Sequence, residues 1–600
     1  MKKARCLLAW LLILALLCGC QTTVPQDTQS PDTDTTETSE TQTPDHDWNL
    51  TGAWAVTMDG TSQVLTAPGV ENAMVLHGTL GLDSGWEITT TVTAEEAAPI
   101  RILLCKSNGD VQLGAGICFS GKKAKLTVDQ WDSGVWENLE TGDNFSVDLA
   151  EPMELKVCHY DGVEDVRVTL TQNGEVLSSL RCKNVTLRAL GMVKMTGVAA
   201  DGKAAFTDFS AGTAVKPETP VDQLLKTMEP GDEGFYLALA EIAVEDMLSN
   251  FWEGDTETGR ILPTSHGYAT GTDYTCMWES AMLAFEVYDM WALTGEEYYR
   301  DLLTAQANYI QTTYDAERLE IASGDQNWAC DDCAWNALLY LSLYTVTGDQ
   351  WFVDRAIGLL DDVNERWYDE ELNGIFYKDG VDFMSLYEVG VAWSWLQLWE
   401  ITGEQRFYDL ALRSYEGMHD RLGAGRDDGL YYCEANAHFH IGEQDGIHEA
   451  GSSSFLTGNM GMAALAAKFY RITGEQEYLD RVYKTNEGLL QYYDNGGVLL
   501  NDRDAWTNGT YTAFYASEVL SLPDTEQMQE LLKNTALSIA TNARTEDGYY
   551  GGSWSGPAEG SGSVWYNAGS VPQQSMTTGT SVMIITAAAI LEAGIEHYTR

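Results

Sequence analysis

A short signature of threonine, glycine and an acid recurs four times in the second half of the chain and most constrains its fold. Each copy follows an apolar stretch with helical spacing and precedes another such stretch. Glycine can end a helix in the left-handed conformation, and the acid then suits the first turn of the next helix. The signature therefore predicts tight helical hairpins. The copies are Leu293-Thr-Gly-Glu-Glu, Val346-Thr-Gly-Asp-Gln, Ile401-Thr-Gly-Glu-Gln and Ile472-Thr-Gly-Glu-Gln.

Apolar periodicity predicts twelve helices, in six pairs, within a domain spanning 222–600. Connections inside the pairs are short, and connections between pairs are long, so a ring of hairpins would gather the long loops at one end. Long loops in a compact domain usually carry function. The sequence thus predicts an all-α (α/α)6 toroid with one elaborated face. The predicted helices are Phe235–Phe251, Trp278–Leu293, Tyr299–Tyr314, Asp332–Val346, Trp351–Trp367, Ser385–Ile401, Phe407–Leu422, Phe455–Ile472, Tyr478–Tyr493, Tyr511–Leu522, Thr525–Ala543 and Thr577–Tyr598. The long connections are 252–277, 315–331, 368–384, 423–454, 494–510 and 544–576.

Residues 48–212 have a different pattern, with short alternating runs separated by turn residues. Such runs, with an Asn173-Gly174 hairpin signal, predict an antiparallel β-sandwich. The stretch Lys203–Ser210 resembles the last strand of concanavalin-like jelly rolls. This domain is a candidate carbohydrate-binding module, although the usual burial of tryptophan favours core or rim packing of Trp131 and Trp136 over a sugar platform. A linker, 213–221, follows it.

The N-terminus has the features of an export signal. Lys2, Lys3 and Arg5 precede the apolar stretch Leu7–Leu17, and a Leu-x-Gly-Cys ending leads to Cys20. The ending resembles a bacterial lipobox, which predicts a signal peptide at 1–19 and a lipid on Cys20. A transmembrane anchor is the alternative, but the apolar stretch is short for a span of about 20 residues. Residues 20–47 are polar and predict a disordered tether.

The charge balance restricts the partners. With 90 acidic and 35 basic residues, the formal net charge is −55. Such a surface disfavours nucleic acids and anionic membranes, whereas an uncharged polysaccharide carries no electrostatic penalty. We therefore expect an extracytoplasmic monomer at the bacterial cell surface that touches the membrane only through its lipid.

Asp331 and Asp332 stand together where a long connection meets a predicted helix. Asp is a preferred residue at helix starts, so capping alone is one interpretation. The other is glycosidic bond cleavage, in which one carboxyl group protonates the leaving oxygen and the second meets positive charge at the anomeric carbon. Their place on the elaborated face favours catalysis, and the two roles are compatible.

The surrounding residues resemble glycoside hydrolase family 76, the endo-α-1,6-mannanases. The string Asp331-Asp-Cys-Ala-Trp-Asn-Ala-Leu338 is similar to the family's Asp-Asp helix, and the stretch Asn542–Pro557 is similar to its Asn-Ala-Arg and Trp-Ser-Gly-Pro segment. The resemblance covers about 222–600. It implies an (α/α)6 barrel that hydrolyses internal α-1,6-mannosidic bonds with retention, with Asp331 as nucleophile and Asp332 as general acid/base.

This chain departs from the family at two places. Trp335-Asn336 stands where many members have Trp-Trp, and Thr457-Gly458-Asn459 stands where a Tyr-Asn-Gln is usual. These changes concern subsites rather than chemistry. Further candidates for sugar contact are chosen for their polar or aromatic type near the elaborated face. They are Trp328, Trp335, Asp325, Ser385, Glu388, Asn459, Trp554 and Gln574.

No cofactor or metal is expected. Cys330-x-x-Cys333 brackets the Asp pair, but without a second such motif it suits helix packing better than a redox or zinc site. A histidine group also lacks a zinc-helix spacing and suits a polar cleft wall. Its members, with two neighbouring acids, are His438, His440, His448, Glu434 and Glu449.

Two alternatives to a mannanase stay open. One is a toroid of related shape that acts on another glycan, such as an epimerase or an unsaturated uronyl hydrolase. The other is a catalytically inactive surface lipoprotein that binds glycan. Product analysis distinguishes the first alternative, and binding without hydrolysis would indicate the second.

Overall fold

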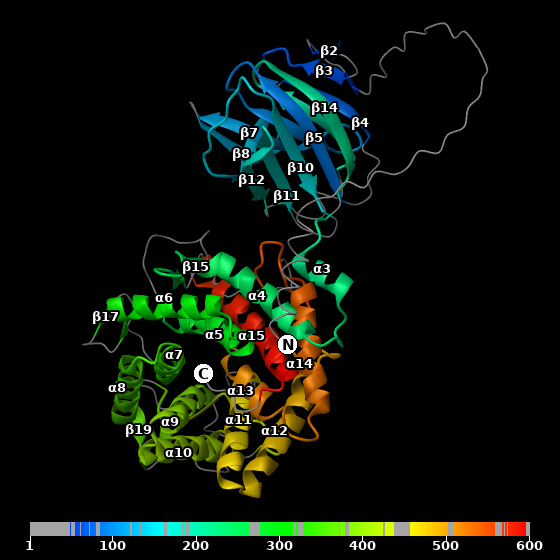
Figure 1. Ribbon diagram of the computed structural model, residues 1–600. Helices are drawn as coiled ribbons and strands as arrows, with labels where there is room; N and C mark the ends of the chain where they lie inside the picture. The colour runs from blue at the N-terminus through cyan, green and yellow to red at the C-terminus, as the bar shows by residue number, and fades with distance from the viewer. Residues whose placement is uncertain are drawn as a thin grey trace, which may run out of the picture. The chain divides into compact units, whose positions relative to one another are not determined.

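The computed structural model divides the chain into two compact units, Met1–Val215 and Lys216–Arg600. Figure 1 shows a strand-rich unit in blue to teal and a helical unit in green to red. The structure describes residues 48–595 except 50–53, 60–61, 71–72, 80–84, 121–122, 133, 161–164, 183–184, 186–192, 215, 263–276, 316–319, 322–328, 371–372, 378–382, 424–425, 437–455, 502–508, 559–566, 569–570 and 573. The predicted signal, tether and Cys20 lie outside the described residues.

The first unit consists of two antiparallel sheets that share one apolar core, as the alternating pattern predicts. Ile102 of one sheet and Val157 of the other are both fully buried in this core. One sheet has the order β1 (Trp48–Asn49), β4 (Ala73–Thr79), β13 (Met195–Ala200), β6 (Ile100–Cys105), β7 (Val111–Ser120), β8 (Lys123–Asp132) and β9 (Val135–Thr141). The other has the order β12 (Glu175–Cys182), β11 (Val166–Gln172), β10 (Met153–His159), β5 (Trp86–Ala94), β14 (Ala204–Thr213), β3 (Ser62–Thr66) and β2 (Ala55–Asp59).

The predicted hairpin turn in this unit is confirmed. The two-residue turn between β11 and β12 is Asn173-Gly174, and both residues have positive φ, 54° and 81°. Only glycine and a few polar residues adopt that conformation readily, which is why this dipeptide closes the hairpin. Trp131 and Trp136 face each other across β8 and β9, with ring centroids 4.7 Å apart. Both are half-buried, and Arg101 lies over the Trp136 ring, so the two rings pack at the edge of the sheet, and their role as a sugar platform stays a prediction.

Among its described residues, the second unit contains all twelve predicted helices, with ends that shift by a few residues. They are α4 (Phe235–Phe251), α5 (Met277–Thr294), α6 (Glu297–Thr313), α7 (Cys330–Thr347), α8 (Gln350–Trp367), α9 (Val389–Thr402), α10 (Gln405–Leu422), α11 (Leu456–Thr473), α12 (Gln476–Tyr493), α13 (Thr510–Glu518), α14 (Glu526–Asn542) and α15 (Gln574–Ala593). A short helix, α3 (Pro220–Thr227), begins inside the stretch predicted as linker. Thr219 and Asp222 form a capping box there, and such a helix start is marked by its capping residues and not by apolar periodicity.

The hairpin signature has a physical explanation in the structure. Gly295, Gly348, Gly403 and Gly474 all have φ near 70°, the left-handed conformation that ends each helix. Each preceding threonine accepts a hydrogen bond from the backbone N–H of the acid that follows the glycine, at 3.1–3.2 Å. The threonine therefore holds the acid at the start of the next helix. The repeated residues specify the turn geometry directly.

Six of the helices contact one another in a closed ring, in the order α5, α7, α9, α11, α13, α15 and back to α5. The partners α4, α6, α8, α10, α12 and α14 pack outside it (Figure 1). Residues Val389 to Leu398 of α9 are all buried, whereas α10 buries only one stripe. A helix that is apolar all round must lie inside, and an amphipathic one can face water. Composition thus separates inner from outer helices.

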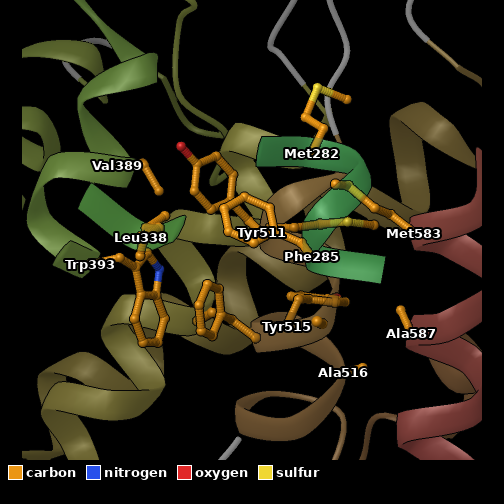
Figure 2. Packing of buried hydrophobic residues seen from close by; sticks show 14 of the residues in the cluster. Met282, Phe285, Leu338, Val389, Trp393, Tyr511, Tyr515, Ala516, Met583 and Ala587 are labelled. Atoms are coloured by element: carbon orange, nitrogen blue, oxygen red, sulfur yellow. The ribbon is translucent and has the colours of Figure 1, made fainter. Parts of the chain in front are cut away.

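Side chains from several ring helices fill the space that the ring encloses. Figure 2 shows Phe285 of α5, Leu338 of α7, Trp393 of α9, Tyr511 and Tyr515 of α13, and Met583 of α15 meeting there. Trp393 stacks on Phe514 at 4.2 Å between ring centroids. A ligand site must therefore lie at an end of the ring and not along its axis.

The second unit is helical in its main elements, as expected, and its long connections add a few short extended segments. These connections contain short antiparallel ladders, whose strands of two or three residues are too short to show a period in the sequence. The ladders pair β15 (Trp252–Glu253) with β16 (Arg260–Ile261), β17 (Tyr314–Asp315) with β18 (Glu320–Ile321), β19 (Tyr368–Asp369) with β20 (Gly374–Ile375), β21 (Phe383–Ser385) with β22 (Glu434–Asn436), and β23 (Asn567–Ala568) with β24 (Val571–Pro572).

Candidate active site

Asp331 and Asp332 occupy the first turn of α7, a helix of the closed ring. Both are half-buried. Asp332 Oδ2 accepts a hydrogen bond from the backbone N–H of Ala329 at 2.9 Å, so this carboxylate closes the helix end, as the capping interpretation predicts. The N–H of Cys330 donates to the carbonyl of Tyr377 at 2.8 Å. The helix start is thus tied to a separate segment of chain.

The two carboxyl groups leave the helix in different directions. Trp335 lies one turn further on, and its ring stacks near Tyr511 of α13 and approaches Phe285 of α5, so it points into the ring. Residues four apart share a helix face, which places Asp331 above Trp335 on the interior side. Successive residues are about 100° apart around a helix, and Asp332 therefore diverges from Asp331.

The electrostatic setting of this end favours negative charge. Every ring helix follows a long connection, so all of them begin at the same end of the ring. Helix N-termini carry partial positive charge, which stabilises a carboxylate in the first turn. The pKa values of the Cys330 and Cys333 thiols are raised far above the usual range, first by burial and then by the neighbouring Asp charges. Both cysteines are free and stay protonated, so they pack the helix start as expected.

Among the described residues no cluster of His, Cys, Asp or Glu could hold a metal ion. The predicted cleft-wall residues His438, His440, His448 and Glu449 lie outside the described residues, and only the backbone of Glu434 is described.

Glu388 and Ser385 are placed beside α7 but inside the protein. Glu388 ends the 3-10 helix η2 (Leu386–Glu388), which contacts α7, and it is fully buried. Burial raises the pKa of its carboxyl group to about 8, although Ser414 and the Ile375 backbone donate hydrogen bonds to it. The hydroxyl of Ser385, also buried, donates to the Cys433 carbonyl at 3.3 Å. Both side chains hold the loops around the Asp pair in place.

Asn459 is also fully buried, in the first turn of α11. Its Oδ1 accepts the N–H of Tyr431 at 2.7 Å, and its Nδ2 donates to the Tyr431 carbonyl at 3.5 Å. The amide thus clamps the backbone of the connection after α10. This use of both amide atoms differs from the sugar contact expected of the residue.

The tryptophans expected to stack on sugar have core positions instead. Trp335 is 3% exposed inside the ring, and Trp554 is 2% exposed. The Trp554 indole N–H donates to Ser581 of α15 at 3.2 Å, because the loop that carries it folds back onto the helices. Trp328 and Asp325 lie outside the described residues, and Gln574 begins α15 with its side chain outside them.

Three buried hydroxyl groups at the same end of the ring were not singled out by sequence reasoning. Ser280 of α5, Thr457 of α11 and Ser575 of α15 each lie within the first turn of a ring helix. Their hydroxyl oxygens have no hydrogen-bond partner within the described part of the chain. A buried hydroxyl without a protein partner is suited to bind water or a ligand oxygen. These hydroxyl residues directly follow long connections, and that position is the sequence signal that could have identified them.

The helical unit is similar to a known protein family and to several solved structures. The model of glycosyl hydrolase family 76 matches residues 236–593. No curated protein matches the chain. Solved structures that are similar include an inactive variant of an α-1,6-mannanase of Salegentibacter sp. HEL1_6 in complex with α-1,6-mannotriose, at 20% identity, over 59% of this chain and 99% of that one, with a TM-score of 0.46. A family 76 glycoside hydrolase from a bovine Bacteroides thetaiotaomicron strain is 14% identical over 89% of this chain and 98% of that one, with a TM-score of 0.47.

A third similar structure is a family 76 mannosidase of Bacteroides thetaiotaomicron VPI-5482, at 17% identity, over 60% of this chain and 98% of that one, with a TM-score of 0.48. The family model itself extends from the first turn of α4 to the last residue of α15. It includes the Asp pair and all of the closed ring, and it spans more than half of the chain. On this match, the chain belongs to glycosyl hydrolase family 76 and is a glycoside hydrolase.

Proposed function

We propose that this chain is a retaining endo-glycosidase that hydrolyses α-1,6-mannosidic linkages in mannan. The observation that carries the proposal is the position of Asp331 and Asp332 in the first turn of a ring helix, at the end where the long connections meet and inside the family match. The substrate class comes from the family resemblance. An uncharged mannan also suits a chain with a net charge of −55.

In the proposed reaction, Asp331 attacks the anomeric carbon while Asp332 donates a proton to the departing glycosidic oxygen. This forms a glycosyl ester on Asp331 and releases the first product. Asp332, now a carboxylate, takes a proton from water, and the water oxygen displaces Asp331 with overall retention. Asp332 Oδ2 accepts the Ala329 amide, so the transferred proton is assigned to Oδ1. Retention requires carboxyl groups about 5–5.5 Å apart, a separation that neighbouring residues at a helix start can reach with diverging side chains.

The fold assignment belongs to the same proposal. The closed ring of helices with six partners outside it supports an (α/α)6 toroid. The two antiparallel sheets over one core support a jelly roll of the concanavalin-like kind.

The test uses the full chain and unbranched α-1,6-mannan, with products separated by size and their anomeric configuration followed by NMR. The expected result is release of manno-oligosaccharides of mixed length with retained configuration. Asp331→Asn and Asp332→Asn should each lower turnover by at least about 10³-fold while the fold is kept. Turnover of another α-linked glycan alone would move the assignment to that substrate. Tight mannan binding without hydrolysis by the wild-type chain would indicate a glycan-binding lipoprotein.

We also propose that Cys20 carries a lipid that anchors the monomeric protein outside the cytoplasm. The supporting observation is the lipobox-like ending Leu17-Cys-Gly-Cys20 before a polar tether. When the protein is expressed in a bacterium, the wild-type chain should partition into the detergent phase and incorporate labelled palmitate, whereas Cys20→Ser should do neither. Partition of the serine variant with the detergent would favour a transmembrane anchor.

A further inference from the structure

Glu388 is a fully buried acid beside the helix start that carries the Asp pair. Its Oε1 accepts a hydrogen bond from Ser414 Oγ of α10 at 2.6 Å, and the backbone N–H of Ile375 also donates to the carboxyl group. No lysine or arginine forms an ion pair with it in the part of the chain that the structure describes. Burial of this kind strongly favours the neutral acid.

The backbone of three consecutive residues, 375–377, connects Glu388 to α7 through one hydrogen bond at each end. Ile375, which donates to Glu388, ends β20, and the next residue, Phe376, donates its N–H to the Trp367 carbonyl at 2.9 Å. The carbonyl of Tyr377 then accepts the N–H of Cys330 at 2.8 Å. Cys330 is the first residue of α7 and directly precedes Asp331. The segment 375–377 is therefore fixed at one end by Glu388 and fixes the helix start at the other.

The same segment is held by a second contact on the side of η2. The ring of Tyr377 packs against the ring of Tyr387, the neighbour of Glu388, with centroids 5.9 Å apart. Without the Glu388 carboxyl group, the Ile375 N–H and the Ser414 hydroxyl would both lack their acceptor. The segment 375–377 could then shift. Catalytic groups displaced by about 1 Å can lose about 100-fold in rate, so a small shift is sufficient to matter.

We propose that Glu388 is a positioning residue, which acts through the segment 375–377 to hold Asp331 and Asp332 in their reactive geometry. This inference rests on the proposed function. Glu388 itself touches no reacting atom, and its neutral state keeps a third negative charge away from the pair.

The charged and titratable groups around Glu388 explain why its neutral state matters for the Asp pair. Cys330 on α7 and Tyr368 after α8 are electrostatically coupled to it, and Asp331 follows Cys330. On α10 the direct partner is Ser414, and the neighbouring Arg413 lies over the Tyr368 ring at 4.6 Å. The titratable residues of α9 and α11 lie in their C-terminal halves, away from η2. Ionisation of Glu388 would therefore add repulsion to the Asp pair.

The experiment compares Glu388→Gln and Glu388→Ala in the full chain by kinetics and by hydrogen–deuterium exchange. Gln keeps an acceptor, so turnover at pH 6 should stay within about 3-fold of wild type, and any alkaline loss of kcat near pH 8 should move to higher pH. Ala should lower kcat by about 10- to 100-fold with little change in KM, and it should speed exchange in peptides covering 329–333. A merely structural role would affect both variants alike and leave the pH profile unchanged.

A matched control is available on α5. Glu286 is another fully buried acid that accepts a hydrogen bond from a hydroxyl side chain, Thr586, at 3.0 Å. Glu286→Gln should leave the pH profile and exchange at 329–333 unchanged. Wild-type exchange at 329–333 in Glu388→Ala, or faster exchange with unchanged kcat, would overturn the positioning role. If the wild-type chain hydrolyses no α-mannan, the proposed function fails, and exchange alone then decides whether Glu388 holds the helix start.

Discussion

Asp332 accepts a hydrogen bond from the backbone N–H of Ala329 at 2.9 Å, so one acid of the candidate catalytic pair also closes the helix that carries both. Capping and catalysis do not compete here, because a carboxyl group has two oxygens and capping uses one. The arrangement fixes one side chain of the pair relative to the backbone. It also separates two consequences of mutation, loss of the cap and loss of the chemistry.

That separation gives the first prediction. Asp332→Ala removes the cap and should lower the free energy of unfolding by about 1 kcal/mol, whereas Asp332→Asn keeps an acceptor and should be nearly as stable as wild type. Both should be inactive on α-1,6-mannan. Asp349 is the matched control, because it caps α8 by accepting the Trp351 N–H at 3.0 Å. Asp349→Ala should lose similar stability but keep activity, as urea unfolding and mannan assays would show. Full activity in Asp332→Asn would contradict the proposed role.

The division of labour between the two acids can be tested with azide. In Asp331→Ala, azide can replace the missing nucleophile and should give a mannosyl azide of inverted configuration from an activated α-mannoside. In Asp332→Ala, azide attacks the glycosyl ester on Asp331, and the product should retain its configuration. NMR of the products distinguishes the two. The opposite pattern would exchange the roles of Asp331 and Asp332.

Glu388 should make stability depend on pH. Its pKa is raised to about 8 from an ordinary value of 4.5. Between these values the unfolded chain loses the proton and the folded chain keeps it, so stability is greatest below about pH 4.5 and falls until about pH 8. The slope from this one group approaches about 1.4 kcal/mol per pH unit. Urea midpoints of wild type and Glu388→Gln should therefore diverge between pH 5 and pH 8, in favour of Gln. Parallel curves would mean that Glu388 is ionised in the fold.

His419 should make the stability of the fold depend on pH below about pH 6.5. Burial, with the nearby Arg481, lowers its pKa to about 4, and its Nδ1 lies 2.9 Å from the Tyr431 hydroxyl oxygen. Below about pH 6.5 this histidine binds a proton in the unfolded chain but not in the folded chain. The free energy of unfolding therefore falls as the pH drops towards 4. His419→Asn should reduce this loss, measured as the change in Tm between pH 7 and pH 4.5. An equally steep loss in the variant would exclude His419 as its source.

The contact between α7 and α9 near the Asp pair should not tolerate an added methyl group. A Cβ at Gly390 would lie 2.7 Å from the Tyr511 hydroxyl oxygen and 2.9 Å from the Ala334 Cβ. Gly390→Ala should therefore cost about 1–3 kcal/mol by overpacking and lower kcat by shifting α7. Gly231→Ala is the control, because a Cβ there meets nothing within 4 Å. Unfolding curves and mannan assays on both variants check this, and equal stability of the two would show that the helices can adjust.

Several features were predictable because they are encoded locally. The hairpins depend on a glycine and a threonine that set the turn through neighbouring atoms, as Gly348 and Thr347 do. The inner helices are identified by apolar residues on all sides, and the Asp pair lies at a helix start because a capping residue precedes an apolar run. Short ladders such as β19 with β20 escaped prediction, since two residues are too few to show a period.

The sequence by itself determined that this chain forms a ring of helical hairpins and that two adjacent acids begin one inner helix at its elaborated end. Only the tertiary structure decided which other side chains are available there. Asn459 is hydrogen-bonded to Tyr431 and Trp554 to Ser581, while burial keeps Glu388 a neutral acid despite the hydrogen bond from Ser414. Each of these partners comes from another segment of the chain. Burial and hydrogen-bond demand are set by such distant contacts, which no local pattern specifies.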